Sequence, residues 1–221
     1  MKKIIWIASY PKSGNTFMRL LLSSYFYTKD GTTENFETIK NIFSMNHYNI
    51  YKNIKNFPTI ESLKNNPQQI TSYWDDAQKL LSENIKNNLF IKTHNCMAEI
   101  LHKTFTNEQF TKCFIYIVRD PRSVVISYKH HFITTYDNAI EQLNNKSLIG
   151  FESTFEKVPE LVSSWGIHYN SWKNFLNKGN GLIIKYEDLV LDPFNTFKKV
   201  LIFLNKFLNF EIDEKKIKKS L

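Results

Sequence analysis

The chain has 221 residues, of which 42% are hydrophobic and 15% aromatic, so it is long and apolar enough to form one domain with a substantial core. Its formal net charge of +8 favours an anionic ligand, although the lysines are scattered among asparagines and isoleucines. No nucleic-acid-binding motif occurs and no apolar run reaches the length of a membrane span, so we expect neither a nucleic acid partner nor a membrane span.

The first predicted elements are an apolar strand at residues 4–9 and an amphipathic helix at 15–27, with a polar turn between them. Such a turn directs backbone N–H groups and a helix N-terminus at one point, which is typical of a phosphate site. Lys12 adds a positive charge, and Gly14 permits a close backbone approach. In the common nucleotide-binding loop the lysine directly follows a glycine, which it does not do here. An ordinary turn with a surface lysine is therefore the alternative to an anion site.

The remaining elements alternate between strands and helices along the chain. Three short apolar runs predict further buried strands, at residues 89–93, 113–119 and 182–186. Helical spacing of apolar residues predicts helices at 74–87, 121–132, 159–177 and 193–208. Strands that are apolar throughout and alternate with helices are typical of a parallel sheet covered on both faces. We therefore predict an α/β fold with a parallel β-sheet flanked by helices on both faces, and an irregular excursion within residues 28–87.

Polar residues follow each predicted strand. The second strand ends in Lys92 and His94, the third in Arg119 and Asp120, and the fourth in Tyr186. In a sheet of this kind, ligands bind beyond the C-terminal ends of the strands. We therefore expect these residues to share one site with the polar turn.

Four segments, in this order, resemble the cytosolic-type sulfotransferases. The loop that binds the 5′-phosphosulfate in that family is resembled by residues 10–17 (YPKSGNTF), and the segment with the catalytic histidine by residues 92–94 (KTH). The 3′-phosphate segment is resembled by residues 114–128 (FIYIVRDPRSVVISY), and a strand end near the adenine by residues 185–189 (KYEDL). The resemblance extends over residues 3–206 and is weak over 28–87. It implies a single sulfotransferase-like domain over residues 1–221, with an α/β fold and a P-loop-like parallel β-sheet flanked by helices on both faces. The expected activity is transfer of the sulfuryl group of 3′-phosphoadenosine 5′-phosphosulfate (PAPS) to a hydroxyl or amine acceptor, without a metal.

The same resemblance implies roles for individual residues. Lys12 would neutralise the leaving phosphate oxygen, and Lys92 would lie beside the transferred group. His94 would take the acceptor proton as general base, helped by the near-neutral pKa of histidine. Arg119 and Ser127 would bind the 3′-phosphate. The donor-binding residues are expected to be Lys12, Ser13, Gly14, Asn15, Thr16, Phe17, Arg119, Ser127 and Tyr186, with Phe17 in place of the usual tryptophan.

Each role has a structural alternative. Arg119 could instead pair with Asp120 or Glu187, Tyr186 could be a core residue, and Ser127 an ordinary helix residue. His94 could also be structural, as we expect of the remaining histidines, which are His47, His102, His130, His131 and His168.

Two alternative functions remain open. A small-molecule kinase of the phosphate-loop type would need a magnesium ligand, for which Asp120 is the candidate. A non-catalytic sulfotransferase-like module would only bind the nucleotide.

The C-terminal part of the sequence departs from the family. The family has an Arg-Lys-Gly run that closes over the 3′-phosphate, whereas this chain ends with four lysines at 215, 216, 218 and 219. We expect that this clamp is missing or that the lysines replace it. The acceptor, a small molecule, lipid or glycan, is expected to contact residues 28–87 and 134–156.

The cysteines and the N-terminus bear on the compartment. Cys96 and Cys113 have the spacing of neither a disulfide framework nor a metal site, and Cys113 lies in an apolar run. The N-terminal apolar run is too short for a signal peptide. We expect a cytoplasmic protein.

Overall fold

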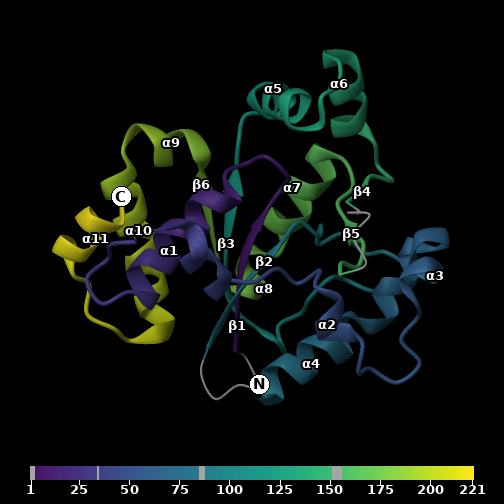
Figure 1. Ribbon diagram of the computed structural model, residues 1–221, viewed down its shortest axis with the longest axis horizontal. Helices are drawn as coiled ribbons and strands as arrows, with labels where there is room; N and C mark the ends of the chain where they lie inside the picture. Colours follow the sequence, from purple (N-terminus) through teal and green to yellow (C-terminus); the bar gives the residue numbers. More distant parts are fainter. Residues whose placement is uncertain (1–2, 34, 85–87, 151–155) are drawn as a thin grey trace.

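The centre of the fold is a four-stranded parallel sheet in the order β2-β1-β3-β6 (Figure 1). The computed structural model describes residues 3–33, 35–84, 88–150 and 156–221. The strands are β1 (Ile4–Ser9), β2 (Leu89–Thr93), β3 (Thr111–Val118) and β6 (Gly181–Lys185). The four predicted strands and their parallel arrangement are therefore confirmed, with ends that agree within two residues.

Both faces of the sheet are buried because alternate residues of each strand point to opposite sides. In β1, Ile4, Trp6 and Ala8 join one hydrophobic cluster, while Ile5 and Ile7 join another. Figure 1 shows helices on both sides of the sheet. The cluster with Ile5 is covered by α1 (Asn15–Tyr27), α9 (Tyr186–Leu191), α10 (Pro193–Leu208) and α11 (Glu214–Ser220). The cluster with Ile4 is covered by η2 (Pro67–Tyr73), α4 (Trp74–Asn84), α7 (Trp165–Asn174) and α8 (Leu176–Gly179).

The segment predicted as irregular contains short helical pieces. These are η1 (Phe36–Asn41), α2 (Tyr48–Tyr51) and α3 (Ile60–Asn65), together with η2. None exceeds seven residues, so hydrophobic periodicity is too short to reveal them from sequence. Residue 34 and residues 85–87, the end of the predicted helix 74–87, lie outside the described part of the chain.

The helix predicted at residues 159–177 is wrong over residues 159–164, and the rest of it is divided into α7 (Trp165–Asn174) and α8 (Leu176–Gly179). Glu160 and Leu161 form β5 (Glu160–Leu161), which pairs antiparallel with β4 (Ile149–Gly150). The helix begins only at α7, where the Ser164 side chain accepts a hydrogen bond from the Ile167 N–H. A serine N-cap is a recognisable helix start, but the apolar spacing around it concealed the boundary.

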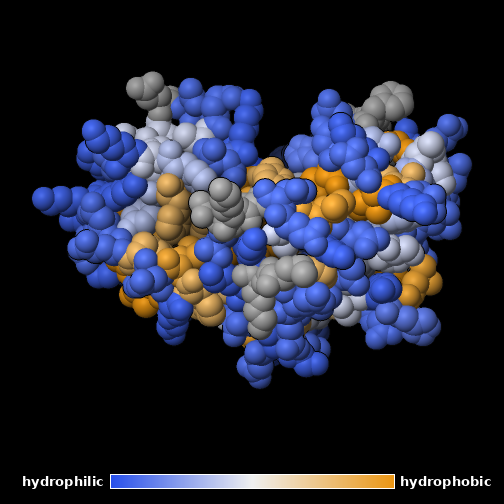
Figure 2. All heavy atoms as spheres, turned by 90° about the horizontal axis from the view of Figure 1, so that it is seen from below, coloured by the Kyte–Doolittle hydropathy of each residue, from blue (hydrophilic) through white to orange (hydrophobic). Residues whose placement is uncertain are grey.

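The strands run toward the end of the molecule that carries α5 (Pro121–Phe132) and α6 (Tyr136–Asn144) (Figure 1). Figure 2 shows the opposite end, which is covered largely by hydrophilic residues with apolar areas between them. Cys96 and Cys113 are both buried and free. Within the described ranges, no helix has the length and apolar character needed to cross a membrane.

Candidate active site

The C-terminal ends of the strands border a cavity of about 780 Å³. The predicted site residues that line it are Lys12, Gly14, Asn15, Thr16, Phe17, Lys92, His94, Arg119, Ser127 and Tyr186. Ser13 is fully buried in the same turn. The structure therefore brings residues from four separate segments of the sequence to one cavity.

The polar turn after β1 exposes the start of α1 to this cavity. Gly14 precedes α1 with a φ of 99°, and no side chain in the described part of the chain caps the helix. The Cβ of any other residue at this position would lie 2.3 Å from a ring carbon of Tyr186, so only glycine fits. Lys12 also has a positive φ, 66°, which is uncommon outside glycine. Burial and the neighbouring Arg119 guanidinium lower the pKa of Lys12.

Asn15 supports the turn from within. Its side-chain amide donates hydrogen bonds to the Ile7 carbonyl at 3.0 Å and to the Ser9 hydroxyl at 3.2 Å. These bonds tie the first residue of α1 to the end of β1. The contribution of Asn15 that the geometry supports most directly is therefore to hold the shape of the turn.

Arg119 connects the turn to β3 and α9. Its Nη1 donates to the Lys12 carbonyl at 3.0 Å, and its guanidinium lies 4.4 Å from the centre of the Tyr186 ring. Its buried Nε has no hydrogen-bond partner among the described residues. The expected alternative pairings are not observed: Asp120 pairs with Arg122 and caps α5, and Glu187 accepts from the Asp120 N–H.

The ring of His94 is held in one tautomer. Its Nδ1 lies 2.6 Å from the Ser9 carbonyl oxygen. A carbonyl can only accept, so Nδ1 carries the proton and Nε2 keeps a lone pair. Burial and the nearby Lys92 ammonium lower the pKa of His94 to about 3. The sequence-based expectation of a near-neutral pKa is therefore wrong for the unliganded site, because the ring is desolvated.

The backbone after β2 is fixed by α7 and β5. His168 Nε2 donates to the His94 carbonyl at 3.1 Å, and its Nδ1 accepts from the Tyr116 hydroxyl at 2.8 Å. The Trp172 indole donates to the Asn95 carbonyl at 3.0 Å. Burial lowers the pKa of His168 to about 4, so this ring is neutral. His168 thus has a structural role, as expected, but one that supports His94 directly.

Lys92 does not have a free ammonium group in the cavity. It forms an ion pair of 2.9 Å with Glu160, and the two side chains are only 12% and 6% exposed. Glu160 also accepts from the His94 N–H at 2.7 Å. Sequence reasoning missed Glu160, whose only signal is a single carboxylate in the apolar run from Val158 to Val162.

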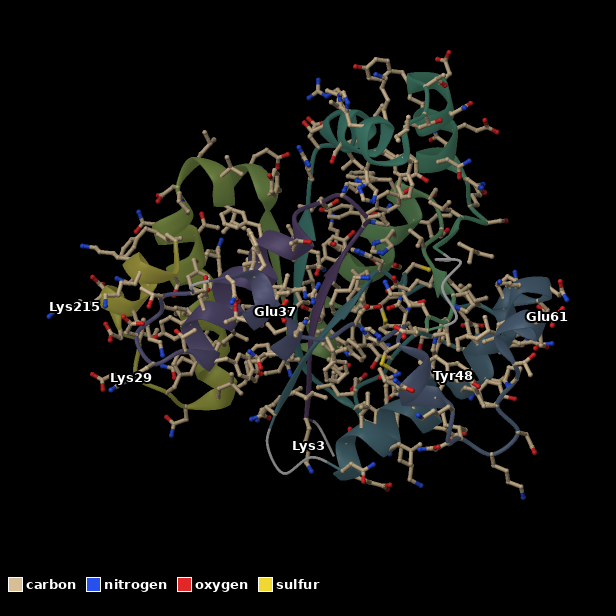
Figure 3. The ribbon with its side chains drawn as sticks, viewed as in Figure 1. Lys3, Lys29, Glu37, Tyr48, Glu61 and Lys215 are labelled. Atoms are coloured by element: carbon tan, nitrogen blue, oxygen red, sulfur yellow. The ribbon has the colours of Figure 1, made fainter. Side chains whose placement is uncertain are left out.

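The four C-terminal lysines lie elsewhere. They belong to α11, which packs against α1 and α10, and the described residues lining the cavity include none of them. Figure 3 shows Lys215 pointing outward at the edge of the molecule. Lys216 and Lys219 bond to the Thr28 carbonyl and to Asp30. The proposed substitution of these lysines for a phosphate clamp is therefore not supported by their positions.

Comparisons with known proteins identify the family. The profile described as "Sulfotransferase domain" matches residues 2–220. An amine sulfotransferase from Oryctolagus cuniculus is 27% identical over 94% of this chain and 58% of its own length. A luciferin sulfotransferase from Photinus pyralis is 26% identical over 93% of this chain and 52% of its own length. The chain thus spans somewhat more than half of each of these relatives.

Solved structures show the same fold. A mouse sulfotransferase complexed with PAP (3′-phosphoadenosine 5′-phosphate) aligns with a TM-score of 0.56 at 20% identity. The alignment covers 99% of this chain and 62% of the mouse chain. A retinol dehydratase in complex with androsterone and PAP aligns with a TM-score of 0.59 at 16% identity, covering 100% and 64%. Because the family profile covers nearly the whole chain and the fold agrees, this chain belongs to the sulfotransferase family.

Proposed function

We propose that the chain is a PAPS-dependent sulfotransferase that transfers a sulfuryl group to the hydroxyl or amine of a small molecule. The observation that carries this proposal is the meeting of three groups at one cavity. These are the uncapped start of α1, the Arg119 guanidinium, and His94 with a lone pair on Nε2. The helix start and the guanidinium are suited to bind phosphates, and His94 Nε2 is suited to accept a proton.

The residues present fit the donor nucleotide. Arg119 Nε and Ser13 Oγ are buried without a partner among the described residues, so a bound anion would supply what they lack. Gly14 leaves the Tyr186 ring in contact with the turn, and Arg119 lies over that ring. We assign Lys12, Ser13, Thr16 and the turn backbone to the 5′ side of the donor. Arg119 and Ser127 would hold the 3′-phosphate, and Phe17 and Tyr186 would flank the adenine.

The chemistry follows from these positions. The acceptor oxygen forms a bond to sulfur while its proton passes to His94 Nε2. The bond between sulfur and the 5′-phosphate oxygen breaks, and PAP leaves with that electron pair. Lys12 stabilises the negative charge on the leaving oxygen, and Lys92 contributes positive charge beside the transferred group. Catalysis of this kind depends on positioning and electrostatic stabilisation.

The wall around the acceptor side favours an apolar, uncharged acceptor. It is lined by Phe132, Leu148, Ile149 and Val162, and the charge of Lys92 is balanced by Glu160. A phenol or an alcohol on an apolar body fits this wall better than a polyanionic glycan does. Asn46, within residues 28–87, also lines the cavity, so we assign this segment to the acceptor side. The domain would comprise residues 1–221, and its free buried cysteines agree with a cytoplasmic location.

Calorimetric titration of PAP in EDTA tests donor binding, and transfer of a labelled sulfuryl group from PAPS to phenols, alcohols, amines and glycans tests turnover. We expect metal-independent PAP binding and turnover of apolar hydroxyl compounds. Nucleotide binding that requires magnesium and ATP would support the kinase instead. PAP binding without turnover of any acceptor would leave only a binding module.

A further inference from the structure

Glu160 joins the two groups to which the proposed reaction assigns proton transfer and charge stabilisation. Its Oε2 accepts from Lys92 Nζ at 2.9 Å and from the Asn46 amide at 3.4 Å. Its Oε1 accepts from the His94 backbone N–H at 2.7 Å. Both carboxylate oxygens are therefore occupied by neighbouring protein groups, which leaves Glu160 poorly suited to bind a cationic acceptor itself.

The backbone on either side of Glu160 is fastened to the same region. The Leu161 N–H donates to the Asn95 side chain at 2.8 Å, and the Leu161 carbonyl accepts from the Cys96 N–H at 2.8 Å. The Val158 N–H donates to the Asn46 carbonyl at 2.8 Å. The backbone that carries Glu160 is thus held by its neighbours through bonds that do not involve Lys92.

A buried ion pair is weak evidence for stability, because desolvation of both charges offsets much of their attraction. The Lys92 and Glu160 side chains nevertheless line the cavity, where a charge can act on a substrate. An ion pair at this place is better explained by what it positions than by the stability that it adds.

We propose that Glu160 is a positioning residue for sulfuryl transfer, one that keeps the Lys92 ammonium charged in the cavity and fixes the backbone that carries His94. This inference rests on the proposed function for its catalytic consequence. Its structural part, the control of the Lys92 charge by Glu160, can be tested without any turnover.

Among the charged groups around Lys92, Glu160 is the one that favours the protonated form of the Lys92 ammonium. Burial lowers the pKa of Lys92, and Glu160 opposes that change. Arg19 and Lys157 lower it further, and His94 is held neutral beside it. Glu160 is the negative group in this set, so its removal leaves a buried ammonium among cations.

The first experiment measures the Lys92 pKa by NMR of its side-chain nitrogen, assigned by loss of the signal in Lys92→Met. In Glu160→Gln we expect this pKa to fall by about one pH unit or more. The matched control is Glu214→Gln, which breaks the surface pair with Lys198 and leaves the Lys92 pKa unchanged. An unchanged Lys92 pKa in Glu160→Gln would overturn the proposal, whatever the enzyme does.

The second experiment measures turnover and PAP affinity of the same variants. For Glu160→Gln we expect near wild-type PAP affinity, because the hydrogen bonds that Glu160 makes among the described residues go to Lys92, Asn46 and the His94 N–H rather than to the turn or Arg119. We expect kcat to fall by about 10- to 100-fold, since small misplacement of reacting groups has effects of this size. The alkaline limb of the kcat profile should move to lower pH with the Lys92 pKa.

Retention of wild-type kcat and pH profile in folded Glu160→Gln would also overturn the positioning role. If that variant does not fold, Lys92→Met/Glu160→Gln removes the uncompensated cation and keeps an acceptor for the His94 N–H. The double variant should then lose the alkaline limb; a wild-type limb would contradict the proposal. Failure of the wild-type chain to bind PAP would instead reject the proposed function, and the NMR result would still decide the control of Lys92 by Glu160.

Discussion

Replacement of Arg119 by alanine is the most direct test of how the cavity binds its donor. Arg119 reaches the Lys12 carbonyl and lies over the Tyr186 ring, yet its Nε lacks a partner among the described residues. The guanidinium therefore has free donor capacity beside the turn. We expect Arg119→Ala to weaken PAP binding more than it changes the rate of the chemical step.

The magnitude follows from the bonds that the variant cannot form. The contacts with Lys12 and Tyr186 exist without a ligand, so they largely cancel in a comparison of free and bound protein. What is lost on binding is a charge-assisted, bidentate contact to phosphate, which contributes about 1.5–3 kcal/mol. This corresponds to an increase of about 10- to 150-fold in the Kd of PAP. The Kd of PAP for Arg119→Lys should lie between those of the wild type and Arg119→Ala, because lysine keeps the positive charge but cannot form the bidentate contact of a guanidinium.

The assay is calorimetric titration of PAP, with circular dichroism and thermal unfolding to verify the fold. Arg122→Ala is the matched control, because Arg122 follows the same strand but is 89% exposed and pairs with Asp120 outside the cavity. Its PAP affinity should remain that of the wild type. Equal PAP affinity in folded Arg119→Ala and Arg122→Ala would refute the assignment of Arg119 to the donor phosphate.

Three further predictions concern the histidines and Lys12. His94→Ala should lose turnover by about 10²- to 10⁴-fold with nearly normal PAP affinity, as measured by single-turnover rates. The exposed His102→Ala should behave as wild type, and equal rates in the two variants would show that His94 is not the base. Lys12→Met should lower both turnover and PAP affinity, because in the proposed function its charge acts on the phosphate before and during the reaction. Unchanged turnover and unchanged PAP affinity would contradict the assignment of Lys12 to the donor site. Acid should destabilise the fold, because His94 and His168 have pKa values of about 3 and about 4 when folded and about 6.5 when unfolded. The unfolded chain therefore binds more protons below pH ~6.5, and the free energy of unfolding should fall by on the order of 1.4 kcal/mol per pH unit for each histidine until pH ~4. Urea unfolding between pH 7.5 and 4.5 measures how the free energy of unfolding changes with pH. This change should be smaller in His94→Ala than in the wild type, and an equal change would contradict the prediction.

Some elements were predictable because the information is local. The buried strand before the turn, Gly14 and the helix that follows lie within 24 consecutive residues, from Ile4 to Tyr27. The strand at 89–93 and the helices at 121–132 and 193–208 were likewise predicted with their observed ends. In each case a short, mainly apolar run or a proline in the first helical turn marks the boundary, and neither signal depends on distant contacts.

Other features depended on contacts between distant segments. The apolar spacing around Glu160 predicts a helix. Only the pairing of β5 with β4 and the bond of Glu160 to the His94 N–H, 66 residues away in the sequence, make Glu160 a strand residue at the cavity. The pKa of His94 likewise depends on the folded structure. It is lower than the near-neutral value expected from the sequence, because burial and Lys92 act on the ring only after folding.

By itself, the sequence determined which residue types stand at the strand ends, since strand, turn and helix signals are encoded by neighbouring residues. It thereby also indicated that Lys12, His94 and Arg119 would share one site. Tertiary structure alone decided which partner each group obtained: the Ser9 carbonyl for His94, Glu160 for Lys92 and the Tyr186 ring for Arg119. Partner choice, tautomer and pKa depend on burial and on distances through space, and these quantities do not exist until the sheet has assembled.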